Sequence, residues 1–352
     1  MLARNHFGGI CAFVIGLAVV GTNPAAAGPA LLFEATSGKV LYAEDQDHLW
    51  HPASLTKIMT AYIAFQAIRD GKVTLDSKVT CTEAAQKEPP SKIGMPIGTE
   101  MSMNLALKAL IIKSANDVAV MIAEKIGGSV DGFVTIMNDT AKKLGMSRTR
   151  FVNPNGLPAI EQVTTARDLA KLSRAILRDF PEHAHYWSEP NFQIGKRRIS
   201  SHNALLKTFE GADGLKTGFI CDSGYNVVAS ATRDGTKLVA VVLGEPTGAE
   251  RTLRAASLLE HGFQHYGWKT FFQTTNIDNL PFDADAQGIM SIRTSVRSWD
   301  CGYRPRTAGR VKTLKSRTQR ASVRRKAKEA AKKSASKAAE AAPAPQKPKA
   351  SN

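Results

Sequence analysis

The first stretch with chemical potential is HPASLTKIMT at residues 51–60, in which Ser54 precedes Lys57 by three positions. The apolar residues that follow recur at helix spacing, so the two side chains should lie one turn apart on the same face of a helix start. A lysine amine in that place can take the proton of a serine hydroxyl and make the serine a nucleophile. An ordinary lysine has a pKa of about 10 and is therefore protonated at neutral pH. This chemistry requires burial or a nearby second cation to lower the pKa of Lys57.

Two further short motifs could complete such a site. Ser114-Ala115-Asn116 interrupts an apolar helical region, and Lys216-Thr217-Gly218 leads into a β-rich run. Ser-x-x-Lys also occurs at 334–337 and Ser-x-Asn also occurs at 201–203, so each motif is weak evidence alone. Lys-Thr-Gly is stronger evidence for such a site, because a chance match is expected in only about one chain in ten. The alternatives are a simple helix cap, a helix-ending polar pair and an ordinary strand entry, and the occurrence of all three motifs in one chain argues against them.

The elements that must position these motifs form two β-rich ends and a helical middle. Hairpins are predicted at 30–45, about a Ser-Gly turn, and at 223–244, about an Asp-Gly turn. Apolar periodicity predicts helices that begin near Leu55, cover 104–128, begin at Thr164 or Thr165, and cover 250–267. This order favours an α+β fold in which an antiparallel sheet is closed by both terminal hairpins and flanked by helices, with a helical subdomain beside it.

The three motifs, in this order, are those of penicillin-binding proteins and class A β-lactamases. The chain resembles the low-molecular-weight penicillin-binding proteins, specifically the serine-type D-alanyl-D-alanine carboxypeptidases, over about residues 30–268. The resemblance is carried by HPASLTKIMTAY, IKSANDVAVMIAE, FVNPNGLP, TTARDLA, SHNALL and DGLKTGF, which follow one another in the expected order. It implies the β-lactamase/DD-peptidase-like fold.

The resemblance also implies catalytic roles. Ser54 would be the acylated nucleophile and Lys57 its general base. Ser114 would relay a proton to the departing D-alanine amine, and Asn116 would hold the peptide carbonyl and the lysine in position. No metal or cofactor is expected.

Substrate-binding roles follow for the third motif. Lys216 would supply positive potential, Thr217 would hydrogen-bond the terminal carboxylate, and Gly218 would leave room for the substrate along the strand edge. The backbone N–H groups of Ser54 and Phe219 would form the oxyanion hole. Many family members continue with an aromatic residue or His and then Thr, whereas this chain has Phe-Ile-Cys at 219–221, so contacts at the pocket edge should differ.

The implied substrate is a peptidoglycan stem peptide that ends in D-Ala-D-Ala, and β-lactam antibiotics are the implied covalent inhibitors. A D,D-endopeptidase uses the same acyl-enzyme chemistry, and the sequence does not separate the two. A β-lactamase is disfavoured, because no Glu-x-x-Leu-Asn stretch lies between the second and third motifs. A non-catalytic envelope-binding protein is the alternative outside the enzymes, and the intact motif residues argue against it.

The charge of the chain is concentrated at its C-terminus. Residues 304–352 hold 16 lysines and arginines and 2 acidic residues, which leaves residues 1–303 with only +2 of the net +16. The Ala/Lys/Arg/Ser/Pro composition of this tail predicts disorder. Binding to anionic envelope polymers is one interpretation of the tail, whereas nucleic acid is a poor candidate for an exported protein.

The N-terminus has the pattern of an export signal. Arg4 precedes an apolar run, and small residues end at Ala27, so residues 1–27 are predicted to be a signal peptide. We therefore expect an exported protein of the periplasm or cell envelope. Residues 28–269 are predicted to form the catalytic domain and residues 270–303 a short extension.

Three cysteines remain after removal of the signal peptide, Cys81, Cys221 and Cys301. Because the number is odd, any one bridge leaves a free thiol, and three reduced structural cysteines are the favoured interpretation. No Cys-x-x-Cys and no Cys/His cluster has metal spacing, which disfavours a zinc site.

Overall fold

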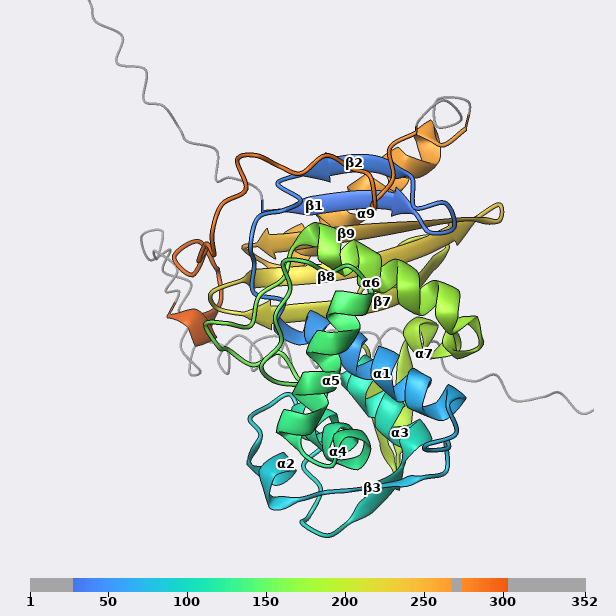
Figure 1. Cartoon of the computed structure of the whole chain (residues 1–352), viewed down its shortest axis with the longest axis vertical. Helices are drawn as coiled ribbons and strands as arrows, with labels where there is room; N and C mark the ends of the chain where they lie inside the picture. Colours follow the sequence, from blue (N-terminus) through green and yellow to red (C-terminus); the bar gives the residue numbers. More distant parts are fainter. Residues whose placement is uncertain (1–27, 268–273, 303–352) are drawn as a thin grey trace, which may run out of the picture. The chain divides into compact units, whose positions relative to one another are not determined.

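The structure is a computed structural model that describes residues 28–267 and 274–302 (Figure 1). The predicted signal peptide at 1–27 and the predicted basic tail at 304–352 lie outside the described residues. Within the ranges that the structure describes, no helix combines the length and the apolar character that a bilayer span requires.

A five-stranded antiparallel sheet has the strand order β2-β1-β9-β8-β7, as expected for the α+β fold (Figure 1). Its strands are β1 (Ala30–Glu34), β2 (Val40–Glu44), β7 (Ala212–Ile220), β8 (Gly224–Arg233) and β9 (Thr236–Glu245). Both predicted hairpins are confirmed. The β8–β9 turn places Asp234 at φ 47° and Gly235 at φ 76°, the positive values that tight hairpin turns require. Pairing of β1 with β9 joins the two hairpins into one sheet.

Helices cover both faces of this sheet, which explains why its strands are apolar at nearly every position. Leu32 of β1 belongs to a core cluster on one face together with Leu259 of helix α9 (Gly248–His265). Its neighbours Leu31 and Phe33 point to the opposite face and join the main core. Helix α6 (Ala166–Asp179) packs on that second face, against β1 and β9.

The chain between β2 and β7 builds the helical subdomain, whose helices surround α1 (Figure 1). Its further elements are η1 (Ala53–Thr56), α1 (Lys57–Arg69), β3 (Lys78–Thr80), α2 (Glu83–Lys87), β4 (Glu100–Ser102), α3 (Met103–Lys108), η2 (Ala109–Lys113), α4 (Asn116–Gly127), α5 (Val130–Lys143), η3 (Pro181–His183), α7 (His185–Ser188), β5 (Asn191–Ile194), β6 (Arg197–Ser200) and α8 (Leu205–Thr208). Every residue of α1 from Lys57 to Phe65 is buried. A helix that is covered on all sides provides a rigid support for the residues at its start.

The helix boundaries agree with the predictions except in one region. Thr165 caps α6, since its side chain accepts a hydrogen bond from the backbone N–H of Asp168. The apolar region at 104–128 is divided into α3, the π-helical segment η2 and α4. The two-stranded sheets β3–β4 and β5–β6 have strands of three or four residues, which are too short to show a clear alternation in the sequence.

The segment 274–302 extends along the domain that residues 28–267 form. The N–H of Val40 donates to the Thr275 carbonyl oxygen, and the N–H of Ile292 donates to the Asp222 carbonyl oxygen. The extension therefore reaches from the β1–β2 hairpin to the end of β7. Ile277 is buried in the main core, so the extension also contributes to packing. It ends in the short helix η4 (Trp299–Cys301).

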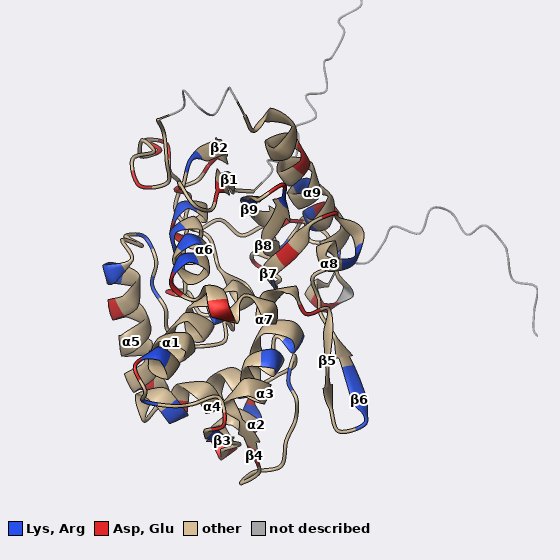
Figure 2. Cartoon of the chain, turned by 90° about the vertical axis from the view of Figure 1, so that its right-hand side faces the viewer, with Lys and Arg blue, Asp and Glu red and all other residues tan. Residues whose placement is uncertain are grey.

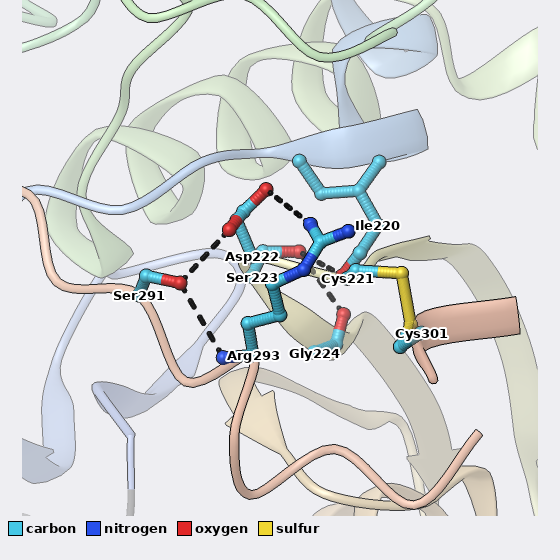
Figure 3. Close-up of a disulfide and its surroundings, with 8 residues drawn as sticks. All are labelled: Ile220, Cys221, Asp222, Ser223, Gly224, Ser291, Arg293 and Cys301. Atoms are coloured by element: carbon cyan, nitrogen blue, oxygen red, sulfur yellow. Dashed lines mark hydrogen bonds and ion pairs between the residues drawn. A yellow bond between two sulfur atoms is a disulfide. The ribbon is translucent and has the colours of Figure 1, made fainter. Parts of the chain in front are cut away.

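Cys221 and Cys301 form a disulfide that ties this extension to the end of β7, whereas Cys81 is a buried free thiol (Figure 3). The expectation of three reduced cysteines is therefore wrong. Three cysteines permit three pairings, and only the path of the extension brings this pair to a Cα–Cα distance of 5.5 Å. Beside the disulfide, the Asp222 carboxylate accepts a hydrogen bond from Ser291 at 2.9 Å and contacts the Arg293 guanidinium at 3.2 Å.

Candidate active site

Ser54 lies in the turn η1, directly before the buried helix α1. The preceding residue, Ala53, has φ 48°, a value that residues other than glycine rarely adopt. Gly156 packs so closely under this turn that a Cβ on it would lie 1.8 Å from the Ala53 carbonyl oxygen. From β8, the buried Asn226 donates its Nδ2 to the His51 carbonyl oxygen at 3.0 Å. These contacts from two other segments fix the turn that carries Ser54.

Lys57 is fully buried at the first position of α1. Its Nζ atom lies 3.0 Å from the Ser54 Oγ. It also donates to the Asn116 Oδ1 at 2.8 Å and to the Asn155 carbonyl oxygen at 2.6 Å. The three acceptors match the three hydrogens of an ammonium group, so the lysine is held in one orientation in either protonation state.

Burial, together with the positive charge of Lys216, holds the pKa of Lys57 well below its ordinary value. The carboxylates of Glu88 and Asp117 act in the opposite direction and only partly offset this effect. Lys216 is itself buried, and burial together with the nearby Arg251 lowers its pKa to about 7. The environment therefore favours the neutral amine that a base requires.

Ser114 and Asn116 lie at the junction of η2 and α4. Ser114 adopts the left-handed conformation, with φ 61° and ψ 38°, and this residue breaks the predicted helical region. The Asn116 side chain is held from both ends, because its Nδ2 donates to the Pro89 carbonyl oxygen at 2.9 Å while its Oδ1 accepts from the lysine. The amide group is thereby oriented before any substrate arrives.

Lys216, Thr217 and Gly218 lie on β7, the edge strand of the sheet. A Cβ on Gly218 would lie 3.0 Å from the Pro52 carbonyl oxygen and 3.1 Å from the Ser54 nitrogen. The absence of a side chain therefore lets β7 approach the nucleophile closely. Among the described strands β7 pairs only with β8, so its other edge is available to an extended ligand.

The predicted residues meet at one cleft of about 390 Å³. Its lining includes Ser54, Ser114, Asn116, Thr217, Gly218 and Phe219. The remaining two, Lys57 and Lys216, are buried beside these lining residues. The structure thus brings together all the site residues that were predicted from the sequence.

Further residues of this site were not predicted from the sequence. Arg251 of α9 lines the cleft, is only 8% exposed, and stacks over the ring of Tyr225 at 5.9 Å. Burial lowers the pKa of this arginine to about 10. Glu88 accepts a hydrogen bond from the Asn155 side chain beside the buried lysine. The sequence holds no signal for Arg251, because an arginine on an amphipathic helix is ordinarily exposed.

A potential metal-ligand group lies outside the cleft. Asp45, His48 and Asp283 bring one nitrogen and two carboxylate groups within 4.8 Å of one another. None of them lines the cleft. In the part of the chain that the structure describes, no other group of at least three such side chains has this spacing.

The model of the D-alanyl-D-alanine carboxypeptidase family matches residues 19–247. D-alanyl-D-alanine carboxypeptidase DacA of Haemophilus influenzae is 37% identical over 242 residues, which are 67% of this chain and 61% of that protein. D-alanyl-D-alanine endopeptidase of Pseudomonas aeruginosa is 32% identical over 227 residues, 62% of this chain and 71% of that protein. The match to the carboxypeptidase spans less than two thirds of that relative's length.

Solved structures show the same architecture. Penicillin binding protein 5 from Haemophilus influenzae is similar with a TM-score of 0.66 and 36% identity, over 68% of this chain and 71% of that chain. Penicillin-binding protein D2 from Listeria monocytogenes, solved in a cefotaxime-bound form, is similar with a TM-score of 0.62 and 32% identity. This second likeness covers 67% of this chain and 97% of that chain.

Proposed function

Because this chain belongs to the D-alanyl-D-alanine carboxypeptidase family, we propose that it removes the terminal D-alanine from peptidoglycan stem peptides through an acyl-enzyme on Ser54. The observation that carries the proposal is the 3.0 Å contact between the Ser54 Oγ and the Nζ of a fully buried lysine. Burial of that lysine near a second cation favours a neutral amine, which is the state that can accept the hydroxyl proton.

Acylation begins when the Lys57 amine takes the proton of the Ser54 hydroxyl. The oxygen attacks the carbonyl carbon of the penultimate D-alanine, and the carbonyl oxygen becomes an oxyanion. The backbone N–H groups of Ser54 and Phe219 stabilise this charge, and removing such a donor typically costs roughly 3–4 kcal/mol in the barrier. The side-chain amide of Asn116 keeps the lysine and the peptide carbonyl aligned.

Collapse of the intermediate breaks the peptide bond. The leaving amine needs a proton, and the Ser114 hydroxyl at the cleft wall passes it from the protonated Lys57. The D-alanine departs as a neutral amine with its carboxylate intact. Water, deprotonated by the same lysine, then attacks the ester and restores Ser54, so the net reaction is hydrolysis of one amide bond.

The terminal carboxylate of the substrate is recognised by positive charge and a hydroxyl. Thr217 and Arg251 both line the cleft, and Lys216 lies buried beside them. The hydroxyl donates a hydrogen bond and the two cations supply a positive field in a site with little water, where the attraction is strong. The scissile bond is thereby placed against the nucleophile.

Intact-mass analysis after exposure to benzylpenicillin tests this proposal. We expect a stable adduct on the protein and none on the Ser54→Ala variant, and we expect the protein to release D-alanine from a soluble peptide that ends in D-Ala-D-Ala. Circular dichroism establishes that both proteins are folded. A folded wild-type protein that forms no adduct and releases no D-alanine contradicts the proposal, and the non-catalytic binding function would replace it.

The place of action belongs to the same proposal. We propose export to the periplasm or cell envelope, on the basis of the signal-like sequence at 1–27, and contact of the tail at 304–352 with anionic envelope polymers, on the basis of its charge. Deletion of residues 304–352 should leave peptide hydrolysis unchanged and reduce retention on isolated cell envelopes. Loss of hydrolysis in that deletion variant contradicts this division of roles.

A further inference from the structure

A second, basic pocket of about 270 Å³ adjoins the catalytic cleft. His202 lines both cavities, so the two are neighbours. The charged residues that line this basic pocket are Lys92, Lys113, Arg197 and Arg198, and no acidic residue is among its described lining residues. A cavity with cations from several segments and no facing carboxylate is a binding place for an anion.

Two of the four cations directly adjoin, in the sequence, residues that line the catalytic cleft. Lys113 is the last residue of η2 and directly precedes Ser114. Lys92 directly follows Ser91, which lines the cleft. Arg197 and Arg198 lie at the start of β6, where lysine and arginine colour the outer strand of the β5–β6 hairpin (Figure 2). The basic pocket is therefore formed partly by residues next to the cleft and partly by the β5–β6 hairpin.

Several of these charges are not neutralised within the part of the chain that the structure describes. Arg198 donates its Nε to the Asn191 side chain, and Lys92 donates to the Gln86 carbonyl oxygen, and both acceptors are uncharged. Neither Lys113 nor Arg197 forms an ion pair with a described carboxylate. The field of these cations is therefore available to a ligand.

His202 marks the side of the cleft on which the basic pocket opens. Partial burial and the charges of Lys216, Lys113 and Arg251 lower the pKa of His202 to about 4, so the imidazole is neutral at pH 7 and lies close to these cations. Under the proposed function, Lys216 and Arg251 receive the carboxylate of the departing residue. The basic pocket therefore adjoins the leaving-group end of the site.

We propose that the basic pocket is a subsite for a second carboxylate on the leaving-group side of the scissile bond. This inference rests on the proposed function and specifies its substrate class. The favoured leaving group is an amino acid that carries an acidic group besides its α-carboxylate. The reaction is the same hydrolysis, with the carboxylate bound but chemically unchanged.

Three matched peptides test the inference, with a common acyl part followed by D-Ala-D-Ala, D-Ala-D-Glu or D-Ala-D-Gln. The last two have leaving groups of nearly equal size that differ in one negative charge. We expect kcat/KM for D-Ala-D-Glu to exceed that for D-Ala-D-Gln by about fivefold, the upper end for a partly exposed ion pair. Raising the ionic strength should reduce this ratio.

A double variant, Arg197→Gln with Arg198→Gln, should bring the ratio close to one and leave D-Ala-D-Ala hydrolysis unchanged. Lys196→Gln is the matched control, because Lys196 is an exposed neighbour on the same hairpin that does not line the basic pocket. A ratio near one in the wild-type protein, an unchanged ratio in the double variant, or an equal loss in the control would overturn the subsite.

The same measurements separate this inference from the proposed function. If D-Ala-D-Ala is hydrolysed and neither longer leaving group is accepted, the proposed function stands and the subsite is wrong. If none of the peptides is hydrolysed by the folded protein, the proposed function itself fails. As a further check, Glu is replaced by Gln on the acyl side of the peptide. If a charge preference appears there and the double variant removes it, the pocket binds the acyl end of the substrate and the proposal is wrong.

Discussion

Lys57 and Lys216 are two buried lysines that lie close enough at the candidate active site for the charge of Lys216 to lower the pKa of Lys57. Lys57 has hydrogen-bonding partners that are all uncharged, and Lys216 donates to the backbone oxygen of its neighbour Thr217 at 3.1 Å. Both amines are buried, and no carboxylate of the described residues is hydrogen-bonded to either of them. The consequences of this arrangement for protonation and stability lead to the first three predictions.

Replacement of Lys216 by glutamine should move the pH dependence of acylation. The charge of Lys216 lowers the pKa of Lys57, so its removal raises that pKa and shifts the ascending limb of the acylation rate to higher pH. The second-order rate constant for benzylpenicillin, measured by intact mass across the pH range, reports the shift. An ascending limb that stays in place would mean that the two lysines are not electrostatically coupled.

Replacement of Glu88 by glutamine should shift the pH dependence of acylation in the opposite direction. The Glu88 carboxylate raises the pKa of Lys57, and the neutral amide can still accept the hydrogen bond from Asn155. We therefore expect the ascending limb of the same acylation profile to shift to lower pH. Glu83→Gln, an exposed change on α2, is the control and should leave the profile unchanged. A shift of Glu88→Gln to higher pH would contradict this account.

Replacement of Lys216 by methionine should stabilise the fold and abolish hydrolysis. The pKa of Lys216 is lowered from its ordinary value to about 7, so the unfolded chain binds more protons between about pH 7 and 10. Wild-type stability should therefore rise with pH across that window, and the gain from the variant should be largest at pH 7 and below. Urea unfolding measures the free energy of unfolding of both proteins at about pH 6.5 and pH 9.5, which lie near the ends of the window. A variant that is less stable at both pH values would contradict the prediction.

Gly218→Ala should slow acylation by roughly a hundredfold. The added Cβ would meet the Pro52 carbonyl oxygen at 3.0 Å, so β7 must move away from the nucleophile, and small misplacements of reacting groups cost about this much. Gly288→Ala is the matched control, because no atom lies within 4 Å of its Cβ position. Acylation by benzylpenicillin is measured for both variants, and equal rates would mean that the close approach of β7 is not required.

Loss of the disulfide should reduce stability more than activity. Cys301→Ser opens a loop with a sequence separation of 80 residues, and loops of that size contribute about 4 kcal/mol in the chain-entropy model. We expect a decrease of that order in the free energy of unfolding. Dithiothreitol should lower wild-type stability to the level of the variant and leave the variant unchanged. If the reductant destabilises both proteins equally, the bridge is not the cause.

Local signals in the sequence were sufficient to predict the hairpins and the start of a helix. The turns that require positive φ at Gly38 and Gly235, and a threonine cap at Thr164 or Thr165, depend on residue types near each position and were predicted, and the structure places the cap at Thr165. The short motifs were also local, because Ser54 and Lys57 are joined by one helical turn. Their meeting with Gly218 depends on tertiary packing, and only the family resemblance supplied it.

Other parts of the site have no local signal. Asn155 contributes its backbone carbonyl oxygen to the buried lysine, and every residue type has that group. Arg251 lies on an amphipathic helix where arginine is ordinarily exposed, so its burial follows from the cleft and not from the pattern. The pairing of Cys221 with Cys301 follows from the path of the extension, which lacks a regular periodicity.

The position of β1 inside the sheet has a consequence for biosynthesis. Leu32, near the start of the chain, pairs with Ala240 of β9, near the end of the catalytic domain. A nascent polypeptide cannot complete this sheet until β9 has been synthesised, and until then one edge of β1 has no native partner. Such long-range pairing makes folding slow and leaves an apolar strand open to aggregation. Products truncated before β9 should therefore be substrates for chaperones and proteases and not smaller working enzymes.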